Sequence, residues 1–280
     1  MSTQAHSVIP FTVCMSVYRN DDAAAFLMAL RSVSTMQSVP PEEIVLVVDG
    51  PVPENTEEMI RQFRGEFANL RVVRFEENKG HAAARQAGMD AAATEWCAIM
   101  DSDDIARPDR FEKQLRYLSG HTDVDVLGGQ IEEFAGITDN KTGKRVVPLC
   151  DKDIKHYLKA RCPMNMMTVL VRKSVVEDSG GFIDWYCEED YYLWIRMAEK
   201  NYIFANMPDV LVDVRAGSEM YSRRGGWRYF KSERMIQKYM VDKGIISCWR
   251  YCFNVTGRFV VQVILPNAVR GWLFRNVFRK

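Results

Sequence analysis

The sequence lacks an uninterrupted apolar run of about 20 residues, the length that a membrane-spanning helix requires. Its longest candidate, Phe259–Leu265, is far shorter and contains Gln262. No lysine or arginine precedes Arg19, so the N-terminus does not have the charge pattern of a signal peptide. We therefore expect a protein that stays in the cytoplasm and has no spanning helix.

Cysteine is scarce and scattered. The seven cysteines form no Cys-x-x-Cys pair, and Cys248 and Cys252, one helical turn apart, are more typical of two buried small side chains than of a metal site. An odd, scattered set argues against a disulfide framework and fits a reducing compartment.

Net charge is also absent, because 37 basic residues balance 37 acidic ones, and this argues against nucleic acid as a partner. The average hides one asymmetry. From Lys243 to Lys280 there is no Asp or Glu, and the basic residues there are Lys243, Arg250, Arg258, Arg270, Arg275, Arg279 and Lys280.

The chain of 280 residues can hold one large domain and an appendage. Apolar segments of strand length alternate with helical patterns. Strands are expected at Phe11–Val17, Glu43–Val48, Leu70–Phe75 and Trp96–Met100, and helices at Ala23–Ser38, Thr56–Phe67 and His81–Ala92. This alternation predicts an α/β, doubly wound sheet with a largely parallel core.

The second half is less regular. We expect a loop or hairpin at 136–147, a short helix at 151–160, a strand at 168–172, an acidic helix start at 187–190, two short strands near Ile203 and Leu211, and helices after Gly226.

The stretch Trp96–Asp104 ends an apolar strand in three carboxylates, Asp101, Asp103 and Asp104, and Pro108 follows as a helix start. In α/β sheets, ligands bind beyond the carboxyl ends of the strands. Clustered carboxylates repel one another unless a hard divalent cation such as Mg²⁺ or Mn²⁺ is shared between them. From these residues alone, a metal site and a solvated acidic turn are equally supported.

Other charged residues fall at the ends of successive elements, and their order resembles that of the inverting family 2 glycosyltransferases of the GT-A fold. The resemblance spans about 11–214 and is carried by Ser16-Val17-Tyr18-Arg19-Asn20, Val48-Asp49-Gly50, Asn78-Lys79-Gly80, Ala84-Arg85-Gln86-Ala87-Gly88, Met100-Asp101-Ser102-Asp103-Asp104 and Glu189-Asp190-Tyr191-Tyr192-Leu193-Trp194. It implies a Rossmann-like doubly wound mixed sheet in a catalytic domain at 1–220, followed by a helical basic extension at 221–280.

The resemblance also implies a UDP-sugar donor and Mn²⁺ or Mg²⁺. Asp103 would be the direct metal ligand, and Asp101 would contact the ribose or the metal shell. Asp49 would accept the uracil N–H, and Arg85 would reach the base or the diphosphate. The other donor-binding residues implied are Ser16, Tyr18, Asn20, Lys79 and Ser102.

Two residues of these motifs, Asp104 and Arg85, have more than one possible role. Asp104 fits a supporting role beside the metal or a helix cap equally well. Arg85 fits a snorkelling side chain on an alanine-rich helix.

The attacking acceptor hydroxyl must lose a proton, and we expect Asp190 to be the general base with Glu189 beside it. The alternative for both is simple charge compensation at a helix N-terminus, worth at most about 1 kcal/mol.

A narrower likeness extends to transferases of the amylovoran and O-antigen type, through Cys162-Pro163-Met164-Asn165 and Met220-Tyr221-Ser222-Arg223-Arg224-Gly225-Gly226. It implies transfer of Gal, Glc or HexNAc to a polyprenyl-diphosphate-linked saccharide during surface polysaccharide synthesis. Arg223 and Arg224 would bind the acceptor diphosphate, since guanidinium groups suit phosphate; a solvated basic turn is the alternative. Met166 stands where this group carries His.

Two other functions are less well supported by the sequence. A sugar-nucleotide nucleotidyltransferase needs a glycine-rich basic loop after the first strand, which Tyr18-Arg19-Asn20-Asp21 is not. A non-catalytic binding module is disfavoured by the intact Asp101, Asp103 and Asp190. The sequence leaves open whether the protein is a homo-oligomer.

The C-terminal segment predicts a membrane partner. In 267–280, Val269, Trp272, Leu273 and Val277 recur near helical spacing, with basic residues between them. Such a helix lies in a membrane interface, so we expect peripheral attachment to the inner face of the cytoplasmic membrane. A helical appendage packed on the catalytic domain, or a dimer contact, is the alternative.

Overall fold

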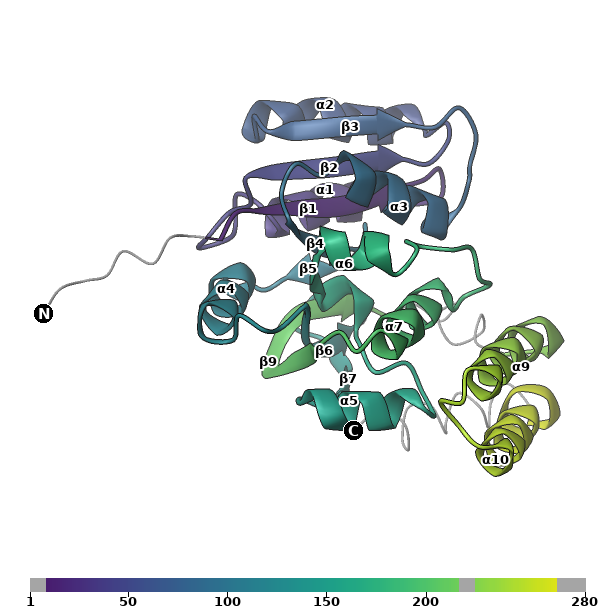
Figure 1. Ribbon diagram of the computed structural model, residues 1–280. Coiled ribbons are helices and arrows are strands. Elements are labelled where there is room, and N and C mark those ends of the chain that lie inside the picture. The colour runs from purple at the N-terminus through teal and green to yellow at the C-terminus, as the bar shows by residue number, and fades with distance from the viewer. Residues whose placement is uncertain (1–8, 217–224, 266–280) are drawn as a thin grey trace, which may run out of the picture.

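A computed structural model describes residues 9–216 and 225–265 (Figure 1). The strands are β1 (Phe11–Val17), β2 (Glu43–Val48), β3 (Leu70–Arg74), β4 (Trp96–Met100), β5 (Ile105–Ala106), β6 (Val126–Phe134), β7 (Lys141–Arg145), β8 (Leu170–Arg172) and β9 (Phe204–Arg215). The helices are α1 (Ala23–Ser32), α2 (Glu54–Glu66), α3 (His81–Ala91), α4 (Arg110–Gly120), α5 (Asp151–Leu158), α6 (Lys173–Asp178), α7 (Glu189–Glu199), α9 (Trp227–Asp242) and α10 (Cys248–Phe259), with a 3₁₀ turn η1 (Met166–Thr168) and a π-helical turn η2 (Val260–Ile264).

The strands form one mixed sheet in the order β3-β2-β1-β4-β8-β6-β9-β5, with β7 paired to β6. The four strands β3, β2, β1 and β4 are parallel, whereas β8 runs antiparallel to both β4 and β6. The expected parallel core with a mixed remainder is therefore confirmed.

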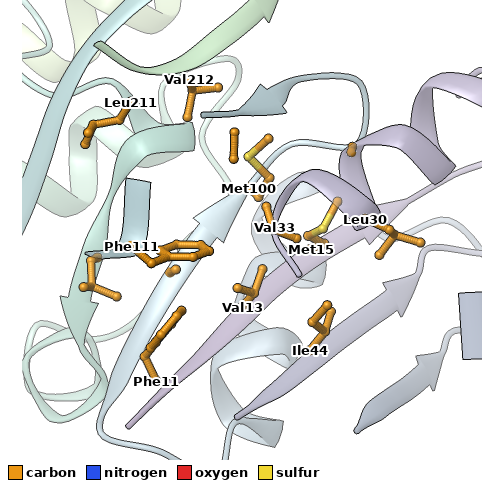
Figure 2. Close-up of a cluster of buried hydrophobic side chains, with 14 of the residues drawn as sticks. Phe11, Val13, Met15, Leu30, Val33, Ile44, Met100, Phe111, Leu211 and Val212 are labelled. Atoms are coloured by element: carbon orange, nitrogen blue, oxygen red, sulfur yellow. The ribbon is translucent and has the colours of Figure 1, made fainter. Parts of the chain in front are cut away.

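Helices cover both faces of the parallel part (Figure 1). The alternation along β1 explains why, because Phe11, Val13 and Met15 point into a core shared with α1, α2 and α4, while Cys14 points toward α3. Figure 2 shows the first of these cores, in which the ring of Phe111 lies 4.6 Å from that of Phe11. The sheet is thus buried on both sides, as its nearly continuous apolar strands require.

Register determines where the loops of the site lie. Val17 of β1 is level with Val48 of β2, and Met15 of β1 is level with Met100 of β4. The segments that follow these three strands therefore leave the sheet at one edge.

Several expected boundaries were wrong. The two short strands near Ile203 and Leu211 are one strand, β9, because β6 pairs with it on both sides of a register shift at Gly128–Ile131. Helix α1 ends at Ser32 rather than at Ser38. At this end of the helix, the Ser32 hydroxyl donates to the carbonyl of Ala29 and accepts the N–H of Ala106.

Other differences are smaller. The helix expected from Pro108 begins at Arg110, after the short strand β5. Only Leu170–Arg172 of the predicted strand at 168–172 is extended. The segment 136–147 is a hairpin, since β7 pairs with β6. Cys248 and Cys252 are exposed rather than buried, because α10 packs through its opposite side.

Helices follow Gly226, as expected. Helix α9 contributes Ile236 and Met240 to the core that contains α7, and α10 packs against α9. Within 9–216 and 225–265 no helix combines the length and the apolar character needed to cross a bilayer. The predicted interfacial helix at 267–280 lies outside the described residues.

Close packing of β6 against β9 depends on Gly128. A Cβ there would lie 2.8 Å from Met164 Cε and would also collide with the side chain of Asn206. We expect Gly128→Ala to lower the free energy of unfolding by about 1–3 kcal/mol. Gly65→Ala on α2, where a Cβ meets nothing within 4 Å, should instead stabilise by up to about 1 kcal/mol. Urea denaturation measures both, and equal stability of Gly128→Ala and wild type would contradict the packing argument.

Candidate functional site

The loops after β1 and β4 are tied together by Asp21. Its Oδ2 accepts the backbone N–H of Tyr18 at 3.1 Å and the hydroxyl of Ser102 at 2.8 Å. Burial raises the pKa of Asp21. The sequence analysis did not select Asp21; the available signal was a carboxylate in the first strand's terminal turn.

Asp49 organises the loop that enters α3. Its carboxylate accepts from Asn78 Nδ2 at 2.9 Å, from the Lys79 N–H at 2.6 Å and from the Gly80 N–H at 3.0 Å. These contacts hold Asp49 and the backbone of Lys79 together at the edge of the sheet. The predicted bond from Asp49 to uracil stays a prediction.

Arg85 connects two motifs that are far apart in the sequence. Its Nη1 donates to Glu189 Oε1 at 2.6 Å and its Nη2 to Asp101 Oδ1 at 3.1 Å. Its side chain is 13% exposed, so the snorkelling alternative is wrong. Although burial opposes the charge, Asp101, Glu189 and Asp190 raise the pKa of Arg85.

The remaining donor-side residues are less engaged. Ser16 and Arg85 line one small cavity beside β4. Tyr18 lies edge-on to His81, with ring centroids 6.4 Å apart. Lys79 Nζ lies 4.8 Å from the ring of Phe75, and Asn20 is exposed. These side chains surround the same sheet edge without forming a continuous bonded network with Arg85.

Asp104 holds the end of β9. It is 2% exposed and accepts the backbone N–H of Arg215 at 2.9 Å, while Arg215 Nε donates to the carbonyl of Asp103 at 3.2 Å. Burial raises the pKa of Asp104 well above its ordinary value. Of its open roles, the structure favours support of the acidic loop over helix capping.

Asp101 and Asp103 fit a divalent cation that is shared with a phosphate group. The described residues contain no set of three or more His, Cys, Asp and Glu arranged to hold a metal. Mg²⁺ is nevertheless commonly bound by only one or two protein carboxylates, and oxygen atoms of the substrate then complete its coordination shell. Burial, and then the charges of Asp101 and Asp21, raise the pKa of Asp103 to about 6.

Three consecutive carboxylates at the start of α7 point to different partners. Glu188 accepts from the hydroxyl of Tyr229 at 2.6 Å, and Glu189 faces Arg85. Asp190 lies 3.7 Å from Cys162 Sγ and lines a cavity of about 520 Å³. Successive helical residues point about 100° apart, so one turn serves both sides of the site.

Two predicted positions do not join these groups. Met166 is 5% exposed and packs in the core around α7, so at that position the chain has core packing in place of a polar contact. Arg223 and Arg224 lie outside the described residues.

Comparison with known proteins agrees with this arrangement. The family model described as "Glycosyl transferase family 2" matches residues 12–180. The chain belongs to this family. As a member it is a glycosyltransferase, and membership favours glycosyl transfer over the nucleotidyltransferase alternative.

Full-length relatives support the assignment. The chain is 35% identical to an uncharacterized glycosyltransferase of Haemophilus influenzae, covering 96% of this chain and 99% of that protein. It is 36% identical to the amylovoran biosynthesis glycosyltransferase AmsE of Erwinia amylovora, covering 80% and 82%. It is 31% identical to the UDP-Gal:alpha-D-GlcNAc-diphosphoundecaprenol beta-1,3-galactosyltransferase of Escherichia coli, covering 96% and 97%.

Among solved structures, the chain is similar to S. aureus TarS 1-349 in complex with UDP-GlcNAc. The TM-score is 0.66 at 18% identity, over 90% of this chain and 73% of that one. This similarity confirms the expected GT-A fold.

Proposed function

We propose that this glycosyltransferase moves a hexosyl group, Gal, Glc or HexNAc, with inversion from a UDP-sugar to a polyprenyl-diphosphate-linked saccharide in bacterial surface polysaccharide synthesis. The observation that carries the proposal is the Arg85 bridge, which joins Asp101 of the acidic loop to Glu189, the residue next to Asp190 at the start of α7. The names of the Erwinia and Escherichia relatives and of the UDP-GlcNAc complex of TarS support the donor and acceptor classes.

The donor diphosphate is assigned to the acidic edge of the sheet. There Asp101 and Asp103 would hold Mg²⁺ or Mn²⁺, which when bound neutralises charge on the departing diphosphate. Arg85 orients Asp101, and its charge opposes the rise that burial causes in the pKa of Glu189. The hydrogen bond from Ser102 to Asp21 holds the loop after β4 against the loop after β1.

We assign Asp190 the role of the general base, which takes the proton from the acceptor hydroxyl. Inversion requires the acceptor hydroxyl to attack from the face opposite the departing diphosphate, where a carboxylate takes the proton. Asp190 accepts the Tyr191 N–H at 2.6 Å, and burial raises the pKa of the nearby Cys162 thiol, which stays neutral. The backbone therefore holds one oxygen of Asp190, a residue that lines the cavity.

A peripheral position on the inner face of the cytoplasmic membrane completes the proposal. Helix α10 exposes Trp249 by 86% and Phe253 by 76%, one helical turn apart, and Ile264 in η2 is 59% exposed. Aromatic side chains on an amphipathic helix favour the membrane interface. A lipid-linked acceptor would require the enzyme to work there.

Replacement of the base tests the function. Asp190→Asn keeps the size of the side chain but cannot accept a proton, so transfer from a UDP-sugar to a synthetic lipid diphosphate saccharide should fall by about 10²–10⁴-fold. Binding of UDP, measured by calorimetry, should be unchanged. Glu189→Gln is the matched variant, and it should weaken UDP binding through Arg85. If Glu189→Gln is inactive with normal UDP binding while Asp190→Asn is active, the two roles are exchanged.

Metal binding provides a second test. In the presence of UDP, Asp103→Asn should bind Mn²⁺ at least about 10-fold more weakly than wild type, because one charged ligand is lost. Asp139→Asn, at an exposed position in the hairpin, is the control and should match wild type. Transfer that continues unchanged in EDTA would overturn the metal assignment.

The membrane contact can be measured by sedimentation with phosphatidylglycerol vesicles. Trp249→Ser with Phe253→Ser should reduce binding at least about 10-fold, since each inserted aromatic side chain contributes on the order of 1.5–3 kcal/mol. Met36→Ser with Ile137→Ser, which also removes two exposed apolar side chains, should bind like wild type. Failure of the wild-type protein to sediment with vesicles at low salt would contradict the proposal.

A further inference from the structure

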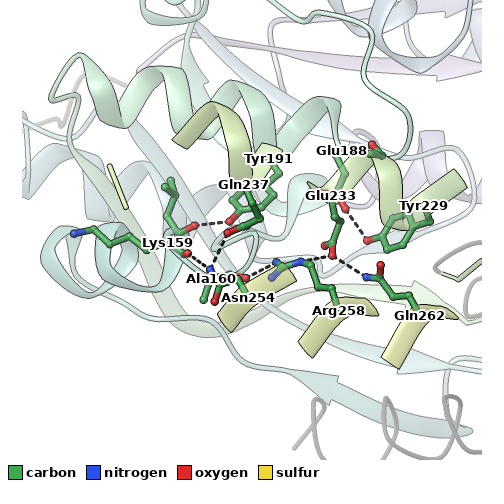
Figure 3. A network of polar contacts seen from close by, with 12 residues as sticks. Lys159, Ala160, Glu188, Tyr191, Tyr229, Glu233, Gln237, Asn254, Arg258 and Gln262 are labelled. Carbon is green, nitrogen blue, oxygen red and sulfur yellow. Dashed lines mark hydrogen bonds and ion pairs between the residues drawn. The ribbon is translucent and has the colours of Figure 1, made fainter. Parts of the chain in front are cut away.

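The cavity beside Asp190 lies where the catalytic sheet meets the C-terminal helices. It has a volume of about 520 Å³, and its walls come from β7, the segment after α5, the start of α7, and α9, α10 and η2. Figure 3 shows the contacts that hold these walls together, with Arg258 between Glu233 and the carbonyl of Ala160. The walls of the cavity are therefore held in place by contacts within the fold.

Three arginines from separate elements line it: Arg145 from β7, Arg161 after α5, and Arg258 from α10. Arg258 is ion-paired with Glu233, and these side chains are 13% and 12% exposed. Arg145 Nη2 donates to the carbonyl of Cys162 at 2.7 Å and forms no ion pair among the described residues. Burial, and among neighbouring cations Arg145 and Arg258, lower the pKa of Arg161. Glu188, Asp190 and Glu233 line the cavity as well, but Glu188 accepts from Tyr229 and Glu233 is ion-paired with Arg258. An anionic ligand would relieve the repulsion that Arg145 and Arg258 exert on Arg161.

The position of Asp190 relates this anion site to the reaction. Cys162 contacts both groups, because its carbonyl accepts from Arg145 and its thiol lies 3.7 Å from Asp190 Oδ2. An anion held by the guanidinium groups would thus lie close to the proposed base, since Cys162 contacts both Arg145 and Asp190. That spacing suits an acceptor whose sugar presents its hydroxyl to Asp190 while its phosphates extend away from it.

The cavity also has an apolar, solvent-facing wall. Phe253 and Val261 line it, and Phe253 is the same side chain that α10 exposes by 76%, one turn after Trp249. A hydrocarbon chain attached to the anion could leave along this wall.

We propose that this cavity is the acceptor subsite, in which Arg145 and Arg161 bind the diphosphate of a lipid-linked saccharide and the Phe253 face of α10 contacts the first part of its lipid chain. The proposal rests on the function proposed above and assigns a different set of arginines from Arg223 and Arg224. Guanidinium groups recognise phosphate oxygens in pairs, so a diphosphate matches two of them better than a single phosphate does.

The test measures binding without turnover. Decyl diphosphate is titrated into the full-length protein by calorimetry, with saturating UDP present to occupy the donor site. Decyl phosphate and inorganic diphosphate are the comparison ligands. Decyl diphosphate should bind at least about 10-fold more tightly than either, since it alone offers both the second phosphate and the chain.

The variants are matched in number and type. Arg145→Met with Arg161→Met should weaken decyl diphosphate binding at least about 10-fold. Arg145→Lys with Arg161→Lys keeps both charges and should lose less, which separates phosphate recognition from a folding defect. Arg61→Met with Arg116→Met removes two exposed arginines and should bind like wild type.

Either of two results would overturn the subsite: wild-type affinity that is equal for decyl diphosphate and decyl phosphate, or undiminished affinity in the Arg145→Met, Arg161→Met variant. Inorganic diphosphate that binds as tightly as decyl diphosphate would remove the lipid from the assignment. Failure of the proposed function has another signature, namely no hexosyl transfer by wild type even though decyl diphosphate binds through these arginines.

Discussion

The site depends on one side chain, Arg85, whose guanidinium is bonded at once to Asp101 and Glu189. Asp101 directly follows β4 and Glu189 begins α7, and the residues of the Arg85–Glu189 pair are 104 positions apart. Without the cation, these two part-buried carboxylates would lie near each other at the edge of the sheet with no opposite charge between them, and they would repel each other. Arg85 therefore fixes where α7 begins relative to the end of β4, and so where Asp190 points.

A second buried cation supports the end of β4. Arg110 is fully buried, and its Nη2 donates to the carbonyl of Ile99 at 3.1 Å. Burial lowers the pKa of Arg110 to about 9, although Asp104 and Asp101 act in the opposite direction. On the other side of the loop, Asp104 anchors Arg215 at the end of β9. The acidic loop is thus held by charged groups that are themselves hidden from water, which keeps Asp101 and Asp103 in place.

The acidic side chains at the beginning of α7 face two chemically different regions. Glu189 faces Arg85 at the acidic edge of the sheet, whereas Glu188 and Asp190 line a cavity walled by α9 and α10. An inverting transferase, as proposed, needs the departing diphosphate and the attacking hydroxyl on opposite faces of the sugar, with the base beside the hydroxyl. The roles proposed for Glu189 and Asp190 fit that need, because adjacent residues on one helical turn point in different directions. The C-terminal helices then have a structural reason to be present, since α10 supplies both Arg258 and the exposed aromatic side chains.

The sequence alone determined the parallel half of the fold and the identity of the acidic motifs. Local patterns were sufficient there: β1, β2 and β4 are apolar runs that end in polar turns, so Asp49 and Asp101 had to leave the sheet at one edge. Local patterns could not determine that β9 is one strand, that Cys248 and Cys252 face outward, or that Asp104 supports β9 and not a helix. These features depend on partners distant in the sequence, such as β6 for β9 and Arg215 for Asp104. Only the tertiary structure brought Arg145, Arg161 and Arg258 to one cavity, because each comes from a different element and no spacing along the chain relates them.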